Sequence, residues 1–292
     1  MQKTNTPFVF VYGSLRVHEG NHRLLASSEL VCKQCSTDGR LYDTGYGFPA
    51  MIQSRGERVY GEMYRVTPEI LKRLDALEGY YGEGRNNHYE RVVQTIYTDM
   101  GNEEAYVYVY PESKANGLEY IKFGDWKFYR IQKHDEDIIY FAYGSCMDNE
   151  RFKLRNKDHL FQDIIGRGVI EGYSLKFTRK ASDGGKADMV EIGGVVEGKV
   201  YRVGHKALEY LLEREGALNY IYRPAFIDIR VGDKVVKDVL TFLVIDNAKE
   251  EVAPPEKYLE EIRRGGKTVW SVEFEKQFEE EIEQKFATVF QM

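Results

Sequence analysis

The sequence is poor in the residues that build disulfides and metal sites. It has three cysteines and six histidines among 292 residues, and an odd number of cysteines does not make a disulfide framework. Cys32 and Cys35 form a lone C-x-x-C motif without a second pair, so buried thiols are favoured over a zinc or redox role, as for Cys146. His18 and His22 stand four apart, but in a glycine-containing stretch that makes a poor helix. We therefore expect no metal site and no cofactor.

Basic blocks and long apolar runs are also missing. The net charge is −6, which argues against nucleic acid or an anionic membrane as the main partner. No apolar run approaches the length of a membrane span, and residues 1–7 show no signal-type region. The sequence has neither a P-loop order nor a dinucleotide fingerprint. With 42% hydrophobic and 30% charged residues, we predict a soluble, cytoplasmic protein of about two domains.

One short sequence motif, called the repeated phrase below, occurs twice in the chain. Residues 8–15 read Phe-Val-Phe-Val-Tyr-Gly-Ser-Leu, and residues 138–146 read Ile-Ile-Tyr-Phe-Ala-Tyr-Gly-Ser-Cys. β-branched and aromatic residues without polar alternation are typical of a strand buried on both faces, and the glycine permits a sharp turn at its end. Backbone N–H groups and a serine hydroxyl at such a turn can point at a ligand. Each phrase therefore predicts a core strand followed by a binding turn.

The sequence downstream of the phrase repeats as well. Residues 59–66 and 196–203 both close in Tyr-Arg-Val, and residues 71–79 and 208–216 both close in Glu-Gly. Two copies, each long enough to hold its own core, indicate a duplicated domain and not a solenoid. We predict one domain over residues 1–130, a polar joint over 131–137 and a second domain over 138–292.

A helix is predicted between Thr67 and Gly79. Thr67 supplies a capping hydroxyl, a proline follows at the first helical position, and Gly79 suits a left-handed cap at the end. Leu71, Leu74 and Glu78 fall at i, i+3 and i+7, which places the carboxylate on the apolar stripe of the helix. The glutamate is therefore expected to point inward.

The second copy keeps this spacing with Leu208, Leu211 and Glu215. Burying an unpartnered carboxylate costs roughly several kcal/mol and raises its pKa. Either glutamate could instead turn outward at the last turn or pair with an arginine. Its recurrence directly before a glycine favours a functional carboxylate.

The remaining segments are predicted to frame these sites. Asn86–His88 and Ala181–Asp188 are interpreted as loops at the rims of the two pockets. A helix is expected to start behind the prolines at 254 and 255, and a last helix from Ser271. Apolar residues repeat along this last helix at Phe274, Phe278 and Ile282. The simplest interpretation docks it on its own domain, and the alternative is docking on a partner.

The Tyr-Gly-Ser turn after an apolar strand, with a Glu-Gly closing a later helix, resembles the γ-glutamylcyclotransferase family and its AIG2-like γ-glutamylamine cyclotransferase relatives. The resemblance covers both halves of the chain. It implies an α+β fold of two tandem γ-glutamylcyclotransferase-like domains, each a small mixed β-barrel with packed helices. It also implies a metal-independent enzyme without cofactor, in which the turn holds the γ-glutamyl part of a small-molecule substrate and the glutamate acts as acid and base.

The resemblance assigns these functions to particular positions. Glu78 in the first copy and Glu215 in the second match the catalytic glutamate. The substrate-binding turn corresponds to Tyr12, Gly13, Ser14 and Leu15 in the first copy and to Tyr143, Gly144, Ser145 and Cys146 in the second. Tyr258 resembles a family tyrosine that contacts substrate. Leu15 brings the first copy closer to the γ-glutamylamine branch, whereas Cys146 departs from the asparagine common there.

The implied reaction is an intramolecular acyl transfer of lyase type. The α-amine closes a five-membered ring on the γ-carbonyl and releases 5-oxoproline and an amine or amino acid, while a glutamate of raised pKa moves the proton. A non-catalytic binding protein, or one working and one structural domain, remain as alternatives. A serine hydrolase using Ser14 or Ser145 is disfavoured because no G-x-S-x-G elbow and no recurring histidine occur. The sequence makes no prediction of oligomeric state.

Overall fold

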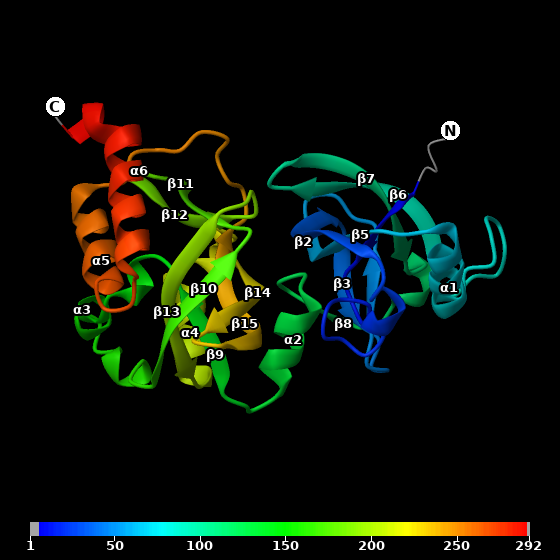
Figure 1. Ribbon diagram of the computed structural model, residues 1–292. Coiled ribbons are helices and arrows are strands. Elements are labelled where there is room, and N and C mark those ends of the chain that lie inside the picture. Colours follow the sequence, from blue (N-terminus) through cyan, green and yellow to red (C-terminus); the bar gives the residue numbers. More distant parts are fainter. Residues whose placement is uncertain (1–5, 291–292) are drawn as a thin grey trace. The chain divides into compact units, whose positions relative to one another are not determined.

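The computed structural model describes residues 6–290 of the chain. The chain divides into two compact units, and the boundary between them falls after Lys133 (Figure 1). The ends of the two predicted domains, residues 1–5 and 291–292, lie outside the described residues. In the described part, no helix is both long and apolar enough to span a membrane.

The first unit is built around a closed barrel of five strands. In barrel order these are β1 (Phe8–Val11), β5 (Arg58–Arg65), β2 (Glu29–Asp38), β6 (Glu90–Thr98) and β7 (Gly101–Val109). Since β1 pairs antiparallel with β5 and parallel with β7, the barrel is mixed. The other elements are β3 (Arg40–Asp43), β4 (Pro49–Ile52), β8 (Glu119–Tyr120), α1 (Pro68–Glu78), α2 (Trp126–Lys133) and the 3-10 turns η1 (His22–Leu24) and η2 (Glu112–Lys114). Helix α2 extends into the segment 131–137 that the sequence suggested as a joint.

The second unit repeats this barrel. Its strands, in the corresponding order, are β9 (Ile138–Ala142), β13 (Val195–Val203), β10 (Ile164–Glu171), β14 (Tyr222–Val231) and β15 (Lys234–Val244). β9 again lies between an antiparallel and a parallel neighbour, β13 and β15. The other elements are β11 (Ser174–Ala181), β12 (Gly184–Val190), α3 (Asn149–Lys153), α4 (His205–Arg214), α5 (Glu256–Gly266), α6 (Val272–Phe290), η3 (Ser145–Met147), η4 (Asp158–Leu160) and η5 (Ala217–Asn219).

The glycine of the repeated strand has the same function in both barrels. A Cβ on Gly61 would lie 2.2 Å from the carbonyl oxygen of Val11, and a Cβ on Gly198 would lie 2.3 Å from that of Ala142. No other residue allows the backbone of the first strand to come this close. The two units are thus equivalent down to single positions, which confirms the predicted pair of mixed barrels.

The helix that carries each candidate glutamate ends as the sequence predicts. At its start, the Thr67 hydroxyl accepts a hydrogen bond from the N–H of Ile70 at 3.4 Å. At its end, Gly79 adopts a φ of 62°, and Gly216 adopts the same angle after α4. Both are left-handed conformations that favour glycine. Each glutamate therefore stands at the last turn of its helix, immediately before the chain leaves it.

The segment Ala181–Asp188 lies at the second cavity as predicted, since Asp183 and Lys186 line it, but the prediction of a loop is wrong because most of the segment is strand. β11 ends at Ala181 and β12 begins at Gly184. A Cβ on Gly185 would lie 1.9 Å from the carbonyl oxygen of Val252. The paired glycines serve the close approach of another backbone inside a strand, and not a loop.

Helix α6 packs on its own unit beside α5 (Figure 1). Its apolar face is buried, at Phe274, Phe278, Ile282 and Phe286. The ring of Trp270 lies 4.9 Å from that of Phe278, and Arg263 of α5 donates to Glu279 at 2.8 Å. This helix extends the core of the second unit.

Candidate active sites

The first turn is anchored to the barrel by its tyrosine. Tyr12 is buried, and its hydroxyl donates to the carbonyl oxygen of Tyr108 at 2.6 Å. A Cβ on Gly13 would lie 2.7 Å from the ring of Pro49, so the turn has room for glycine alone. Tyr12 thus fixes the turn, and its hydroxyl already has a partner.

The backbone of this turn offers free hydrogen-bond donors. The N–H groups of Gly13, Ser14 and Leu15 donate to no other residue in the described part of the chain. Asn21 holds the serine from the other side, since its side chain donates to Ser14 Oγ at 3.0 Å and its N–H to the Ser14 carbonyl at 2.9 Å. Successive free N–H groups form a site suited to a carboxylate or an oxyanion.

Glu78 and all four residues of the turn line one cavity of about 320 Å³. Burial raises the pKa of Glu78 to about 7. No lysine, arginine or histidine of residues 6–290 forms an ion pair with it. The remaining lining residues are Phe10, Val11, Asn21, Phe48, Pro49, Leu77, His88, Tyr89 and Tyr108. The site therefore combines a carboxyl that can change protonation near neutral pH with a row of N–H donors.

Aromatic side chains form one wall of this cavity. The His88 ring lies 5.0 Å from that of Tyr89 and 5.5 Å from that of Tyr110, and Phe48 packs against both His88 and Tyr89. Burial, with a smaller effect of Lys114, lowers the pKa of His88. The rim segment predicted at 86–88 thus contributes His88 to the cavity as a neutral ring.

A buried ion cluster behind the turn was not anticipated from the sequence. Arg16 is 2% exposed and donates to Asp125 at 3.0 Å and to Glu62 at 3.3 Å. Glu62 also accepts from the N–H of Val17 at 2.8 Å and from the Tyr64 hydroxyl at 2.9 Å. Burial of such a charge is tolerated only with full pairing. The cluster ties the segment after the turn to strand β5.

The corresponding position in the second unit has the opposite charge. Lys199 stands where Glu62 stands in the first unit, since Lys199 pairs with Ala142 and Glu62 with Val11 across the same two strands. The Lys199 ammonium donates to the carbonyl oxygen of Met147 at 2.6 Å. Both side chains hold the segment after the turn, one as acceptor and the other as donor.

The second candidate site opens into a larger cavity of about 740 Å³. Glu215, Tyr258 and, of the turn residues, Ser145 line this cavity, whereas Tyr143, Gly144 and Cys146 do not. The Tyr143 hydroxyl donates to the carbonyl oxygen of Phe242 at 2.5 Å, as Tyr12 does to Tyr108 in the first unit. The anchoring of the turn is conserved between the units, but the exposure of the turn is not.

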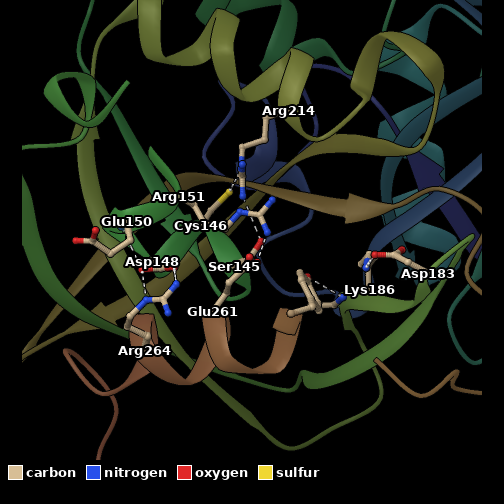
Figure 2. A network of polar contacts seen from close by, with 12 residues as sticks. Ser145, Cys146, Asp148, Glu150, Arg151, Asp183, Lys186, Arg214, Glu261 and Arg264 are labelled. Atoms are coloured by element: carbon tan, nitrogen blue, oxygen red, sulfur yellow. Dashed lines mark hydrogen bonds and ion pairs between the residues drawn. The ribbon is translucent and has the colours of Figure 1, made fainter. Parts of the chain in front are cut away.

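Arg214 engages the second turn directly (Figure 2). Its Nε donates to Cys146 Sγ at 2.9 Å and its Nη2 to Ser145 Oγ at 3.3 Å. The Cys146 thiol donates to Glu215 Oε1 at 2.9 Å, and Arg214 lies 3.9 Å from the same oxygen. Burial raises the pKa of Cys146 to about 12, which keeps it a thiol. The first unit has Leu77 at the position of Arg214, and leucine can make none of these contacts.

Tyr258 reaches the second turn from α5. Its hydroxyl accepts from the N–H of Ala187 at 3.1 Å and would lie 3.5 Å from a Cβ on Gly144. Burial raises its pKa to about 12, so the phenol is neutral near pH 7. The sequence therefore indicated the elements that meet at this site. Its alternative that a glutamate pairs with an arginine applies to Glu215, which lies 3.9 Å from Arg214, but it gave no signal for the contacts of Arg214 with the turn.

The chain was compared with known proteins and their structures. A family model described as "Gamma-glutamyl cyclotransferase, AIG2-like" matches residues 9–128. YkqA of Bacillus subtilis, whose name places it in the same family, is 42% identical over 271 residues, covering 91% of this chain and 94% of YkqA. This chain belongs to the AIG2-like γ-glutamylcyclotransferase family.

Structure and sequence agree on this membership. The crystal structure of YkqA matches with a TM-score of 0.85 at 39% identity and covers 94% of this chain and 97% of its own. The γ-L-glutamyl-butirosin B γ-glutamyl cyclotransferase of Niallia circulans is 39% identical over 127 residues, which are 43% of this chain and 79% of that enzyme. The tandem arrangement of two barrels is thus shared with YkqA.

Proposed function

We propose that the first unit converts γ-glutamyl compounds to 5-oxoproline and a free amine, with Glu78 as acid and base. The observation that carries this proposal is the placement of Glu78, with its pKa of about 7, in one cavity with the free N–H groups of the turn. A carboxyl whose pKa is close to the operating pH transfers protons efficiently in both directions.

The steps follow from these groups. The carboxylate of Glu78 takes a proton from the substrate's α-ammonium, and the free amine attacks the γ-carbonyl carbon to close the ring. The N–H groups of Gly13, Ser14 and Leu15 stabilise the negative charge of the substrate α-carboxylate or of the oxyanion. Glu78 then delivers its proton to the leaving nitrogen as the C–N bond breaks. The carboxylate so regenerated takes the second proton from the ring nitrogen, and the departing amine carries that proton away as an ammonium. The proton balance is internal, so the reaction needs no co-reactant.

The lining of the cavity favours an uncharged leaving group. It contains no lysine or arginine, and one of its walls is aromatic. A carboxylate on the leaving group, as in a γ-glutamyl amino acid, would be desolvated without a counter-ion. We therefore favour γ-glutamyl amines as the substrate class.

The second unit is proposed not to catalyse this reaction. Glu215 Oε1 already accepts a hydrogen bond from Cys146, and Arg214 contacts Ser145. The glutamate and the turn are therefore hydrogen-bonded to protein groups. This leaves the glutamate less able to exchange protons with a substrate and the turn less able to bind one.

The test is release of 5-oxoproline from a matched pair of substrates, γ-glutamyl isopropylamide and γ-glutamyl alanine, which differ by a methyl group in place of a carboxylate. We expect product from both. kcat/KM should be at least about tenfold higher for γ-glutamyl isopropylamide, since burying the unpaired carboxylate of γ-glutamyl alanine costs more than about 1.4 kcal/mol. Equal or reversed values would contradict the substrate class. If the folded protein releases no 5-oxoproline from either of these two compounds or from glutathione, the proposed reaction itself is contradicted.

A further inference from the structure

The cavity of the second unit is positively charged in a chain of net charge −6. Six of its lining residues are cationic, namely Arg151, Arg155, Arg179, Lys186, Arg214 and Lys257. Four are acidic, namely Asp183, Glu213, Glu215 and Glu261. The first cavity, in contrast, is lined by no lysine or arginine. The two cavities of the duplicated fold thus have different charge, and the second is suited to anions.

Two of these cations are held against tyrosine rings in the cavity wall. The Lys186 ammonium lies 4.7 Å from the centre of the Tyr258 ring, and the Arg179 guanidinium lies 5.8 Å from that of Tyr222. Stacking of this kind restricts the side chain without neutralising its charge. Both cations are therefore restricted in position, and Lys186 uses one of its three donors on Asp183 at 2.8 Å.

The carboxylates of the cavity leave part of this charge uncompensated. Arg151 pairs with Glu261, and Lys186 pairs at 2.8 Å with Asp183, whose side chain is 65% exposed. Arg155, Arg179 and Lys257 form no ion pair within residues 6–290. Arg179 is half-buried and interacts with Asp183 only at longer range. A half-buried guanidinium that no carboxylate contacts can anchor an external anion.

We propose that this cavity binds a small polyanion that carries phosphate or carboxylate groups, with Arg179 and Lys186 as its main contacts and Lys257 as a peripheral one. The volume of about 740 Å³ is within the range of small-molecule sites. The donors belong to separate elements, β11 for Arg179, β12 for Lys186 and α5 for Lys257. The proposal does not depend on the reaction at Glu78, because every residue involved belongs to the second unit.

The experiment is isothermal titration calorimetry of the full chain at low ionic strength with pyrophosphate, citrate and acetate as probes. We expect one binding site per chain, with pyrophosphate or citrate bound at least about tenfold more tightly than acetate and less tightly as salt is added. Preference for pyrophosphate identifies a phosphorylated ligand, and preference for citrate a polycarboxylate. Arg179→Gln should weaken binding of the preferred probe about tenfold or more, and Arg179→Lys should weaken it less.

Arg230→Gln is the matched control, since it removes the same charge from an exposed position of β14 outside the cavity. This variant should bind the probe like the wild type. If Arg179→Gln does not fold, as judged by its thermal unfolding, Lys257→Gln replaces it with a smaller expected loss. No heat with pyrophosphate or citrate, or equal weakening by Arg179→Gln and Arg230→Gln, would overturn the proposal.

Discussion

Glu78 and Glu215 occupy equivalent helical positions but differ in their neighbours. Glu78 is preceded by Leu77 and lies in a cavity without cations, where burial raises its pKa to about 7. Glu215 is preceded by Arg214 and accepts a hydrogen bond from Cys146. The chemistry of a carboxylate depends on what surrounds it, so equal spacing does not give equal function.

The pH dependence of the reaction should report on Glu78. The proposed first step needs the carboxylate, so kcat/KM should rise about tenfold per pH unit on the acid side and level off near pH 7. The measurement is kcat/KM for a γ-glutamyl amine between pH 5 and 8. A profile that is flat over this range, as a carboxyl with the ordinary pKa of 4.5 would give, would contradict the role of Glu78.

The stability of the first unit should depend on the same group. Its carboxyl has a pKa of 4.5 when unfolded and about 7 when folded, so the folded state favours the protonated form. The free energy of unfolding should therefore fall as the pH rises from about 4.5 to about 7 and stay low above it. Glu78→Gln removes this penalty, and the variant should be more stable than wild type by about 2 kcal/mol at pH 8, with little difference at pH 4.5.

The two tryptophans allow this to be measured in one unit at a time. Trp126 lies in the first unit and Trp270 in the second. Urea unfolding followed by Trp126 fluorescence in a Trp270→Phe background reports the first unit alone. Equal stability of Glu78→Gln and wild type at pH 8 would show that the carboxyl is not buried as described.

Sequence reasoning reached both glutamates and the possibility of an arginine partner, but not the contacts of Arg214 with the binding turn. A helical period of 3.6 residues fixes which positions face the core, and a glycine fixes where the helix ends. These local rules do not fix the direction of a long flexible side chain at the end of a helix. That direction depends on hydrogen bonds to a binding turn that is distant in the sequence. The departure at Cys146 was the one signal that the second site had changed.

At the scale of elements, each unit fastens the segment after its turn to the second barrel strand. The first unit uses Glu62 with Arg16, and the second uses Lys199 with the carbonyl oxygen of Met147. The binding turn is thereby held at both ends, by a buried tyrosine before it and a buried polar contact after it. Such support keeps the N–H groups of the turn in a fixed arrangement.

Removing Arg16 should be costly. Arg16→Met introduces the residue found at the corresponding place in the second unit, Met147, but leaves Glu62 and Asp125 buried without their cation. We expect a loss of about 3–5 kcal/mol in the free energy of unfolding of the first unit, measured by urea unfolding with Trp126 as reporter. Arg40→Met is the control. Its ion pair with Glu57 is at the surface, so it should cost at most about 1 kcal/mol. Equal losses for both would contradict a structural role of the cluster.

Local signals were sufficient for some elements and misleading for one. Capping residues placed α1 correctly because helix ends are stabilised by near neighbours in sequence. The glycines at 184 and 185 suggested a loop, yet they lie in β12 because the backbone of Val252 passes against them. A contact between such distant segments leaves no mark in the local pattern.

At the scale of the whole molecule, the chain contains two copies of one barrel fold, and the second copy carries an additional helix. The two barrels share strand order and the tightly packed glycines, and this duplication was readable from the repeated phrases. The second unit adds helix α6, whose buried face joins its core.

Helix α6 should therefore contribute to the stability of the second unit. Phe278→Ala removes a buried ring that packs 4.9 Å from Trp270, and we expect a loss of about 3–5 kcal/mol. The measurement is urea unfolding followed by Trp270 fluorescence in a Trp126→Phe background. Val272→Ala on the same helix is the control. Val272 is 78% exposed, so this substitution should change the free energy of unfolding by less than about 0.5 kcal/mol. A Phe278→Ala variant as stable as the control would mean that α6 is not part of the core.

The most direct test of the central proposal is the rate of 5-oxoproline release by Glu78→Gln and Glu215→Gln measured side by side. If the first unit alone performs the reaction, Glu78→Gln should lower kcat by at least about 100-fold, as expected for loss of a general acid and base. Glu215→Gln should then retain the wild-type rate within about twofold. Loss of product with Glu215→Gln, or full activity of a folded Glu78→Gln protein, would contradict the assignment.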